Sequence, residues 1–86
     1  MKEIVKILKA LANERRLKLL KEIYKAGSLN VGDAGGMLML SFRSTSKHLQ
    51  KLRDAGLLEA RQVGAAVHYY ASKEIDPKIK TIIEII

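Results

Sequence analysis

The sequence predicts a mainly α fold with a small β-hairpin, in the order ααααββα. Up to Gly56, apolar residues recur mostly at helical spacing. Two short segments in which apolar and polar residues alternate then follow, Leu57–Val63 and Ala66–Ala71, joined by Gly64-Ala65, which indicates a hairpin. The chain has 86 residues, of which 48% are hydrophobic, so we expect one small ordered domain over residues 1–86.

Two amphipathic helices are expected at the start of the chain. The first covers residues 2–12, and its apolar stripe consists of Ile4, Ile7, Leu8 and Leu11. Asn13 is a suitable N-cap for a second helix that runs from Glu14 to about Lys25. The apolar stripe of this second helix consists of Leu17, Leu20, Ile23 and Tyr24. Gly27 then suits the helix end.

A third helix is predicted from Val31 to Met39. Asn30 is its expected N-cap, with Asp33 three residues later as a capping-box partner. Gly35 and Gly36 are unfavourable here, because each costs about 1 kcal/mol relative to alanine inside a helix. One small residue is expected where two helices of a helix-turn-helix cross closely, but the second glycine has no explanation in the sequence.

The fourth helix, from Ser41 to Ala55, is the most informative segment. Ser41 is a good N-cap, and Gly56 suits the left-handed position after a helix end. Its predicted buried face consists of Thr45, Leu49 and Leu52. Its opposite face is basic and polar, and consists of Arg43, Lys47, Gln50 and Lys51, with Ser44 and Ser46 near the start. A last helix opens with Asp76-Pro77 and contains Ile79, Ile82, Ile83 and Ile86.

Two helices joined through a short turn and followed directly by a hairpin make a winged helix-turn-helix. The helix-turn-helix covers residues of about 30–55 and the wing about 57–71. The segments Leu8–Leu17, Leu40–Leu57 and Val67–Tyr70 resemble the ArsR type of winged-helix regulator. The resemblance implies a homodimeric transcriptional regulator whose fourth helix enters the major groove of DNA. It also implies dimerisation through the first and last helices, about 2–12 and 76–86.

The chain departs from the metal-sensing members of that family. Those members use paired cysteines on the third helix, or His and Asp/Glu ligands on the last. This chain has no cysteine, which excludes thiolate metal sites, disulfides and thiol redox switching, and its last helix offers only Asp76 and Glu84. Its two histidines, His48 and His68, lie on the fourth helix and in the wing. We therefore expect no metal and no cofactor.

The charge of the chain favours a polyanionic partner. The net charge is +7, and the window from Ser41 to Arg61 holds five Lys/Arg against two acids. Arginine and lysine can contact guanine or phosphate, and glutamine can pair with adenine. The residues expected to contact a pseudo-palindromic double-stranded operator are Ser41, Arg43, Ser44, Ser46, Lys47, Gln50, Lys51 and Arg61. Gly64-Ala65-Ala66 at the wing tip carries no basic side chain, so a weak wing contribution is expected.

Three side chains leave alternatives open. Arg15 and Arg16 oppose the dipole at a helix start, which suggests DNA phosphate, or a carboxylate such as Glu14 or Asp54, as their partner. Phe42 either contacts a sugar or a thymine methyl group, or packs against the preceding helix.

The first and last helices carry more apolar surface than so small a chain can cover. Such a surface usually marks an interface. The expected homodimer interface consists of Ile4, Ile7, Leu8, Leu11, Ile79, Ile82, Ile83 and Ile86. No membrane segment or signal peptide is recognisable, so a cytoplasmic location is expected.

Repression by promoter occupancy is the favoured function, with activation left open. Two other interpretations remain, a sequence-indifferent architectural DNA-binding protein and a winged-helix module that binds protein. An enzyme is not expected, because no nucleophile–base pair, carboxylate dyad or phosphate loop is visible.

Overall fold

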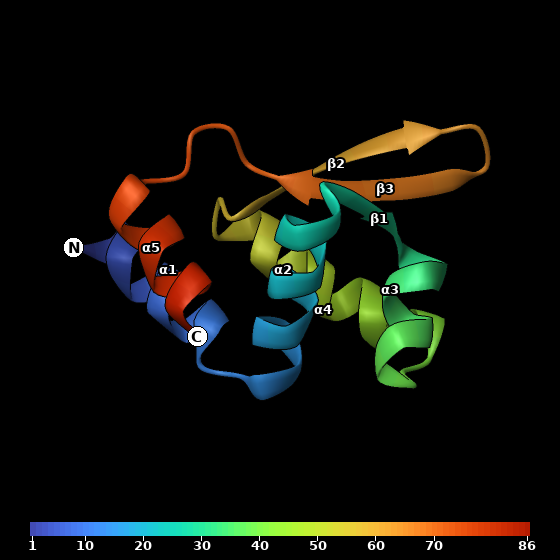
Figure 1. Cartoon of the computed structure of the whole chain (residues 1–86), viewed down its shortest axis with the longest axis horizontal. Helices are drawn as coiled ribbons and strands as arrows, with labels where there is room; N and C mark the ends of the chain where they lie inside the picture. The colour runs from blue at the N-terminus through green and yellow to red at the C-terminus, as the bar shows by residue number, and fades with distance from the viewer.

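The computed structural model describes residues 1–86 without a gap. Its elements are α1 (Lys2–Leu11), α2 (Glu14–Ala26), β1 (Ser28–Asn30), α3 (Val31–Leu38), α4 (Phe42–Asp54), β2 (Leu58–Val63), β3 (Ala66–Ala71) and α5 (Pro77–Ile85). The sheet covers one side of the helices, with α1, α5 and both chain termini at one end and the wing tip at the other (Figure 1). The mainly α fold with a hairpin wing is confirmed, with one strand added.

The added strand, β1, turns the predicted hairpin into a three-stranded antiparallel sheet of order β1-β3-β2. Leu29 of β1 lies opposite Tyr69 of β3. Gly27, at φ +90°, directs the chain out of α2 and into this strand. The sequence did not indicate β1, because three residues are too few to display the alternation that marks a strand. The strand ties the start of α3 to the wing.

Side-chain caps begin four helices at the predicted residues. The Asn13 side chain accepts from the Arg16 backbone N–H at 3.0 Å, and Asn30 accepts from Asp33 at 2.7 Å. At the start of α4, Ser41 Oγ accepts from the Ser44 N–H at 3.0 Å. At the start of α5, Asp76 Oδ1 accepts from the Lys78 N–H at 2.8 Å. Each cap satisfies a backbone donor that the helix itself leaves unpaired.

The core is built around α2, whose Leu19, Leu20 and Ile23 are almost completely buried. Leu20 and Ile23 were predicted core residues. Leu19 was not, whereas the predicted Leu17 and Tyr24 are only half-buried. The difference arises because α2 is covered on more than one side, by α1, α3, α4, α5 and the sheet. A helix surrounded in this way buries a wider arc than a single stripe.

The two glycines of α3 differ in their surroundings. A Cβ added to Gly35 would lie 2.6 Å from Thr45 Oγ1 and 3.1 Å from the Leu40 carbonyl oxygen, whereas one added to Gly36 would meet no atom within 4 Å. Gly35 is thus the small residue required where α3 crosses α4. Nothing in the structure explains Gly36. None of the five helices has the length and apolar content needed to cross a membrane.

Candidate nucleic-acid interface

Helix α4 separates a buried face from an exposed basic face. Thr45, Leu49 and Leu52 are completely buried, as predicted. On the other side of the helix lie the exposed side chains of Arg43, Lys47, Gln50 and Lys51. None of these four makes an ion pair within the chain. The helix therefore presents unneutralised cations to solvent while its opposite face holds it to the body.

Two of the predicted serine contacts already have partners in the chain. Ser41 Oγ accepts the capping bond from Ser44, and Ser46 Oγ accepts from Gln50 Nε2 at 3.1 Å. A serine hydroxyl also carries one donor hydrogen, so both groups can still donate to a phosphate or base. Ser44 and Ser46 are half-buried beside the exposed cations. The Gln50–Ser46 bond holds the glutamine amide against the helix surface.

The start of α4 presents apolar side chains to solvent. Phe42 is 67% exposed, and Met39 in the preceding turn is 94% exposed. Packing against α3, one of the two alternatives for Phe42, therefore does not bury this ring. Met39 adopts a left-handed backbone conformation with φ +56°, which turns the chain sharply from α3 into α4. The aromatic ring is thus displayed directly beside Arg43 at the N-terminus of α4.

The wing contributes one cation, Arg61 in the second half of β2, and none at its tip. The Arg61 guanidinium lies over the Tyr70 ring, 5.4 Å from the ring centre, in a cation–π contact. Gly64 and Ala65 are exposed and uncharged, and the Gln62 side chain donates to the Gly64 carbonyl at 3.1 Å. Tyr70 thus holds Arg61 on the outer face of the sheet.

Arg16 has a partner that the sequence did not indicate. Its Nε donates to the Ala10 carbonyl at 2.7 Å, and its Nη2 donates to the Lys9 carbonyl at 3.2 Å. These carbonyls belong to the last turn of α1, where the helix dipole favours a cation. The expected carboxylate partners, Glu14 and Asp54, pair instead with Lys18 at 3.3 Å and with Arg53 at 3.8 Å. Arg16 therefore joins α1 to α2.

His48 lies half-buried on α4, close to a group of cations. Burial is the largest cause that lowers the pKa of His48 from its ordinary value of 6.5, and the charges of Arg16, Arg15 and Lys51 lower it further. The ring is consequently neutral near pH 7. No three His, Asp or Glu side chains gather in a group that could hold a metal ion.

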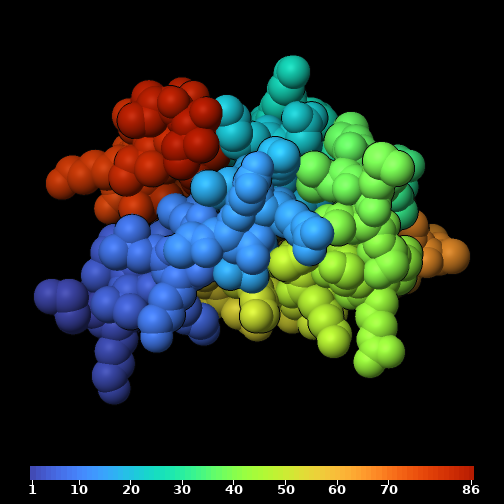
Figure 2. Space-filling model, turned by 90° about the horizontal axis from the view of Figure 1, so that it is seen from below, coloured from blue at the N-terminus to red at the C-terminus, as the bar shows by residue number.

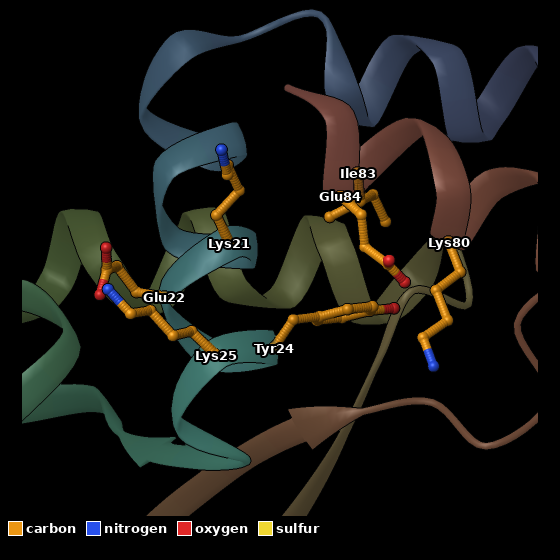
Figure 3. Close-up of a pocket in the computed structure, with 7 residues that line it drawn as sticks. All are labelled: Lys21, Glu22, Tyr24, Lys25, Lys80, Ile83 and Glu84. Atoms are coloured by element: carbon orange, nitrogen blue, oxygen red, sulfur yellow. The ribbon is translucent and has the colours of Figure 1, made fainter.

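A separate hollow of about 630 Å³ lies between α2 and α5 (Figure 3). Its lining carries both signs of charge and consists of Lys21, Glu22, Tyr24, Lys25, Lys80, Ile83 and Glu84. The Tyr24 ring extends from α2 towards α5, and its hydroxyl donates to the Leu57 carbonyl at 3.1 Å. Burial raises the pKa of Tyr24 to about 12, so the hydroxyl remains a donor at neutral pH. Tyr24 thereby links α2 to the start of the wing.

The α1–α5 end exposes aliphatic side chains, but not every predicted interface residue is among them. Leu11, Ile79 and Ile83 are buried in the core of the chain itself, and Ile7 is half-buried. The other four predicted residues are exposed, and two further aliphatic residues are exposed with them. The exposed set consists of Ile4, Val5, Leu8, Ile82, Ile85 and Ile86. We call this set the aliphatic end.

Comparisons with known proteins identify relatives along almost the whole chain. No protein-family model matches the sequence. The transcriptional activator HlyU of Vibrio cholerae is 38% identical over 82 residues, which cover 95% of this chain and 72% of HlyU. The transcriptional repressor PagR of Bacillus anthracis is 35% identical over 80 residues, covering 93% of this chain and 77% of PagR.

Solved structures agree with the sequence relatives. Reduced HlyU from Vibrio cholerae superposes with a TM-score of 0.83 at 37% identity, over 98% of this chain and 84% of HlyU. A homodimeric winged helix-turn-helix DNA-binding domain from Mycobacterium bovis, a possible ArsR-family regulator, gives a TM-score of 0.84 at 27% identity, over 98% of this chain and 74% of that domain. With this fold, an exposed basic face on α4 and relatives of such identity and coverage, the chain belongs to the ArsR family of winged helix-turn-helix transcriptional regulators.

Proposed function

We propose that the chain acts as a homodimer that binds a pseudo-palindromic operator and represses transcription without sensing metal. The observation that carries this proposal is the division of α4 into a completely buried face and an exposed face of unpaired cations. A helix held in this way can enter the major groove, where Arg and Lys contact guanine and Gln contacts adenine. Arg43, Lys47 and Gln50 are the proposed base-reading residues.

The backbone contacts come from groups around that face. Lys51 lies one helical turn beyond Lys47 on the same exposed side. The Ser41 and Ser44 hydroxyls at the helix start can donate to phosphate, and so can Arg61. Such contacts fix the register of the helix without reading sequence.

Dimerisation supplies the second reading helix. The aliphatic end leaves six large apolar side chains exposed, and a two-fold contact between two copies would cover them. Two α4 helices could then lie about 34 Å apart, one turn of DNA, on the two halves of the operator. The Mycobacterium bovis domain, which is described as homodimeric, supports this arrangement.

Repression is supported by the position of a dimer on promoter DNA, and independence from metal by the lack of metal ligands. A dimer seated on a promoter excludes polymerase from the same DNA, and PagR is a repressor of this kind of fold. The absence of cysteine and the separation of His48 on α4 from His68 on β3 leave no imidazole or thiolate set for a transition metal. We expect operator affinity to be unchanged by EDTA or added Zn²⁺.

Selection of bound fragments from random-sequence DNA tests the proposal. We expect a palindromic site, bound more tightly than a scrambled duplex of the same composition. Equal affinity for the two duplexes would favour an architectural protein, and no binding at all would favour a protein-binding module. In vitro transcription from a promoter that contains the selected site should fall when the chain is added, and a rise would contradict repression.

Variants of α4 test the proposed reading face, which we define as the exposed side chains of Arg43, Lys47 and Gln50. Lys47→Ala and Arg43→Ala should each weaken binding to the selected site by about 5–150-fold for each half-site, since a good base contact contributes roughly 1–3 kcal/mol. Lys25→Ala, which removes an exposed lysine at the far end of α2, is the matched control for loss of charge. Retention of specific binding by the double variant R43A/K47A would refute the assignment of these residues.

A further inference from the structure

A shallow hollow of about 220 Å³ lies between α1, the start of α2 and the second half of α4. These three segments share the face of the molecule seen from below in Figure 2. The hollow is lined by Lys6, Lys9, Ala10, Arg16, Lys51 and Asp54. We call it the basic hollow, because it gathers four cations around one carboxylate.

The cations of the basic hollow lack acidic partners. The chain has three ion pairs, which join the terminal amine to Glu3, Lys18 to Glu14 and Arg53 to Asp54. Asp54, the one carboxylate of the hollow, therefore already has Arg53 as its neighbour at 3.8 Å. Four cations around a single carboxylate leave the hollow with a net positive charge, so the site is suited to an anion that arrives from outside.

Arg16 is positioned in advance for such an anion. Its two bonds to the carbonyls of Lys9 and Ala10 fix the guanidinium plane at the end of α1. A guanidinium has five N–H donors, so most of them remain available after these two bonds. A cation that is already oriented loses less conformational entropy when it binds. Arg16 thus offers a fixed donor beside two flexible lysines.

The positive potential of the basic hollow reaches α4. His48 lies within the influence of Arg15 and Arg16 from α2 and of Lys51 from its own helix, and these charges oppose its protonation. Lys51 belongs both to the hollow and to the exposed face of α4, one turn beyond Lys47. The hollow is therefore continuous with the proposed reading face.

Because the basic hollow adjoins the exposed face of α4, one class of anion is favoured as its ligand. Where a helix lies in the major groove, the phosphates of the two strands run along the groove edges beside it. A cationic site that adjoins the reading helix meets such a phosphate when the helix enters the groove. We propose that the basic hollow binds a backbone phosphate of the same duplex that α4 reads, through Lys6, Lys9 and Arg16. The inference rests on the proposed function, since it extends the DNA contact from α4 to α1.

The test compares two double variants of equal charge. Lys6→Gln/Lys9→Gln removes the flexible cations of the hollow, and Lys25→Gln/Lys78→Gln removes two exposed lysines elsewhere, on α2 and α5. All four side chains are exposed, so both variants should fold, which circular dichroism and a thermal melt would verify. The dissociation constant for the selected operator is then measured over a series of salt concentrations.

We expect K6Q/K9Q to bind the operator at least about 10-fold more weakly than the parent chain at moderate salt. The plot of log affinity against log salt should also become less steep by about 2, because each of the two hollows in the dimer loses one phosphate contact. The loss should be the same for operator and scrambled DNA, because phosphate contacts carry no sequence information. Ethylation interference should reveal phosphates that matter to the parent chain and not to K6Q/K9Q.

The possible outcomes are distinguishable. If K6Q/K9Q matches K25Q/K78Q in affinity, slope and footprint, the basic hollow makes no DNA contact and the inference is overturned, while α4 recognition stands. If the parent chain binds no DNA at all, the proposed function fails and the inference fails with it. A loss restricted to the operator sequence would also contradict a phosphate contact.

Discussion

The two ends of the molecule both expose large apolar side chains, but in different surroundings. The aliphatic end groups side chains from two helices, with Ile85 76% exposed and Leu8 54% exposed. The reading end, at the turn between α3 and α4, exposes Met37, Met39 and Phe42, beside the unpaired cation Arg43. Exposure alone is therefore a poor guide to the partner. Unpaired cations flank both surfaces, since Lys6 and Lys9 lie on α1, so what differs is the apolar set: six aliphatic side chains from two helices at one end, and three apolar side chains at one turn beside the basic face of α4 at the other.

The largest expected effect lies at the aliphatic end. Leu8→Glu places a charge on the surface proposed to be covered in the dimer, where an unpaired buried charge is strongly unfavourable. The variant should sediment as a monomer. Its operator affinity should fall by at least about 100-fold, because a single half-site supplies only half of the base contacts. Sedimentation velocity and DNA binding measure the two effects.

Met39→Glu is the matched control for Leu8→Glu. It introduces the same charge at a side chain that is 94% exposed, but at the reading end. We expect this variant to remain dimeric. Dissociation of both variants, or of neither, would show that the two exposed apolar surfaces do not differ in the way proposed here.

The next effect concerns the stability of the contact between α3 and α4 at the reading end. Gly35→Ala would bring a methyl group to 2.6 Å from Thr45 Oγ1, which is buried and donates to the Ser41 carbonyl at 2.8 Å. We expect a loss of about 1–3 kcal/mol in the free energy of unfolding, the usual cost of overpacking. Gly36→Ala, with no atom near the added methyl, should gain up to about 1 kcal/mol from helix propensity.

Urea unfolding of the two alanine variants measures the difference. Both substitutions add one methyl group to the same helix, so the gain in helix propensity is the same for both. The difference between their free energies of unfolding therefore mainly reports the contact of the Gly35→Ala methyl group with Thr45. Equal stabilities would mean that α3 can move away from α4 without cost.

The sequence predicted those parts of the fold that local chemistry determines. The caps Asn13, Asn30, Ser41 and Asp76 and the buried face of α4 followed from side-chain type and spacing. Features that depend on distant segments were not predictable. β1 forms only because β3 lies beside it, and Leu19 is buried only because α2 is surrounded.

The same distinction applies to the candidate site. The basic face of α4 is local, since its residues repeat at helical spacing, and it was visible in the sequence. The basic hollow was not visible, because it joins Lys6 on α1, Arg16 on α2 and Lys51 on α4. The mismatch of Arg16 with the helix dipole was the one signal available. It indicated that Arg16 has a partner, but pointed to a DNA phosphate or a carboxylate such as Glu14 or Asp54, not to the carbonyl groups of α1 that Arg16 contacts.

A smaller effect tests why an aromatic ring is exposed at the reading end. Phe42 is exposed at the N-terminus of α4, and we expect it to touch the methyl group of a thymine, an apolar contact that phenylalanine can make in the major groove. Replacing thymine by deoxyuridine at one operator position should then weaken binding about 3–5-fold, the value of one buried methyl group. Phe42→Ala should abolish the difference between the two bases. If no position discriminates thymine from deoxyuridine, the ring does not read a methyl group.

The smallest effect lies at the boundary between the reading face and the basic hollow, at His48. In the free chain, burial and the charges of Arg16, Arg15 and Lys51 hold the pKa of His48 below 6.5. A phosphate bound in the hollow would offset those charges, so the pKa should rise when DNA binds. Binding would then take up a proton, and affinity should increase as the pH falls through the range below 6.5.

Titration of the histidine ring signals by NMR, in the free chain and in the complex, measures this shift directly. His48→Gln assigns the signal and should flatten the dependence of operator affinity on pH. An unchanged or lower pKa in the complex would mean that no phosphate neutralises Arg16 and Lys51. The duplex would then contact α4 and the wing without reaching the basic hollow.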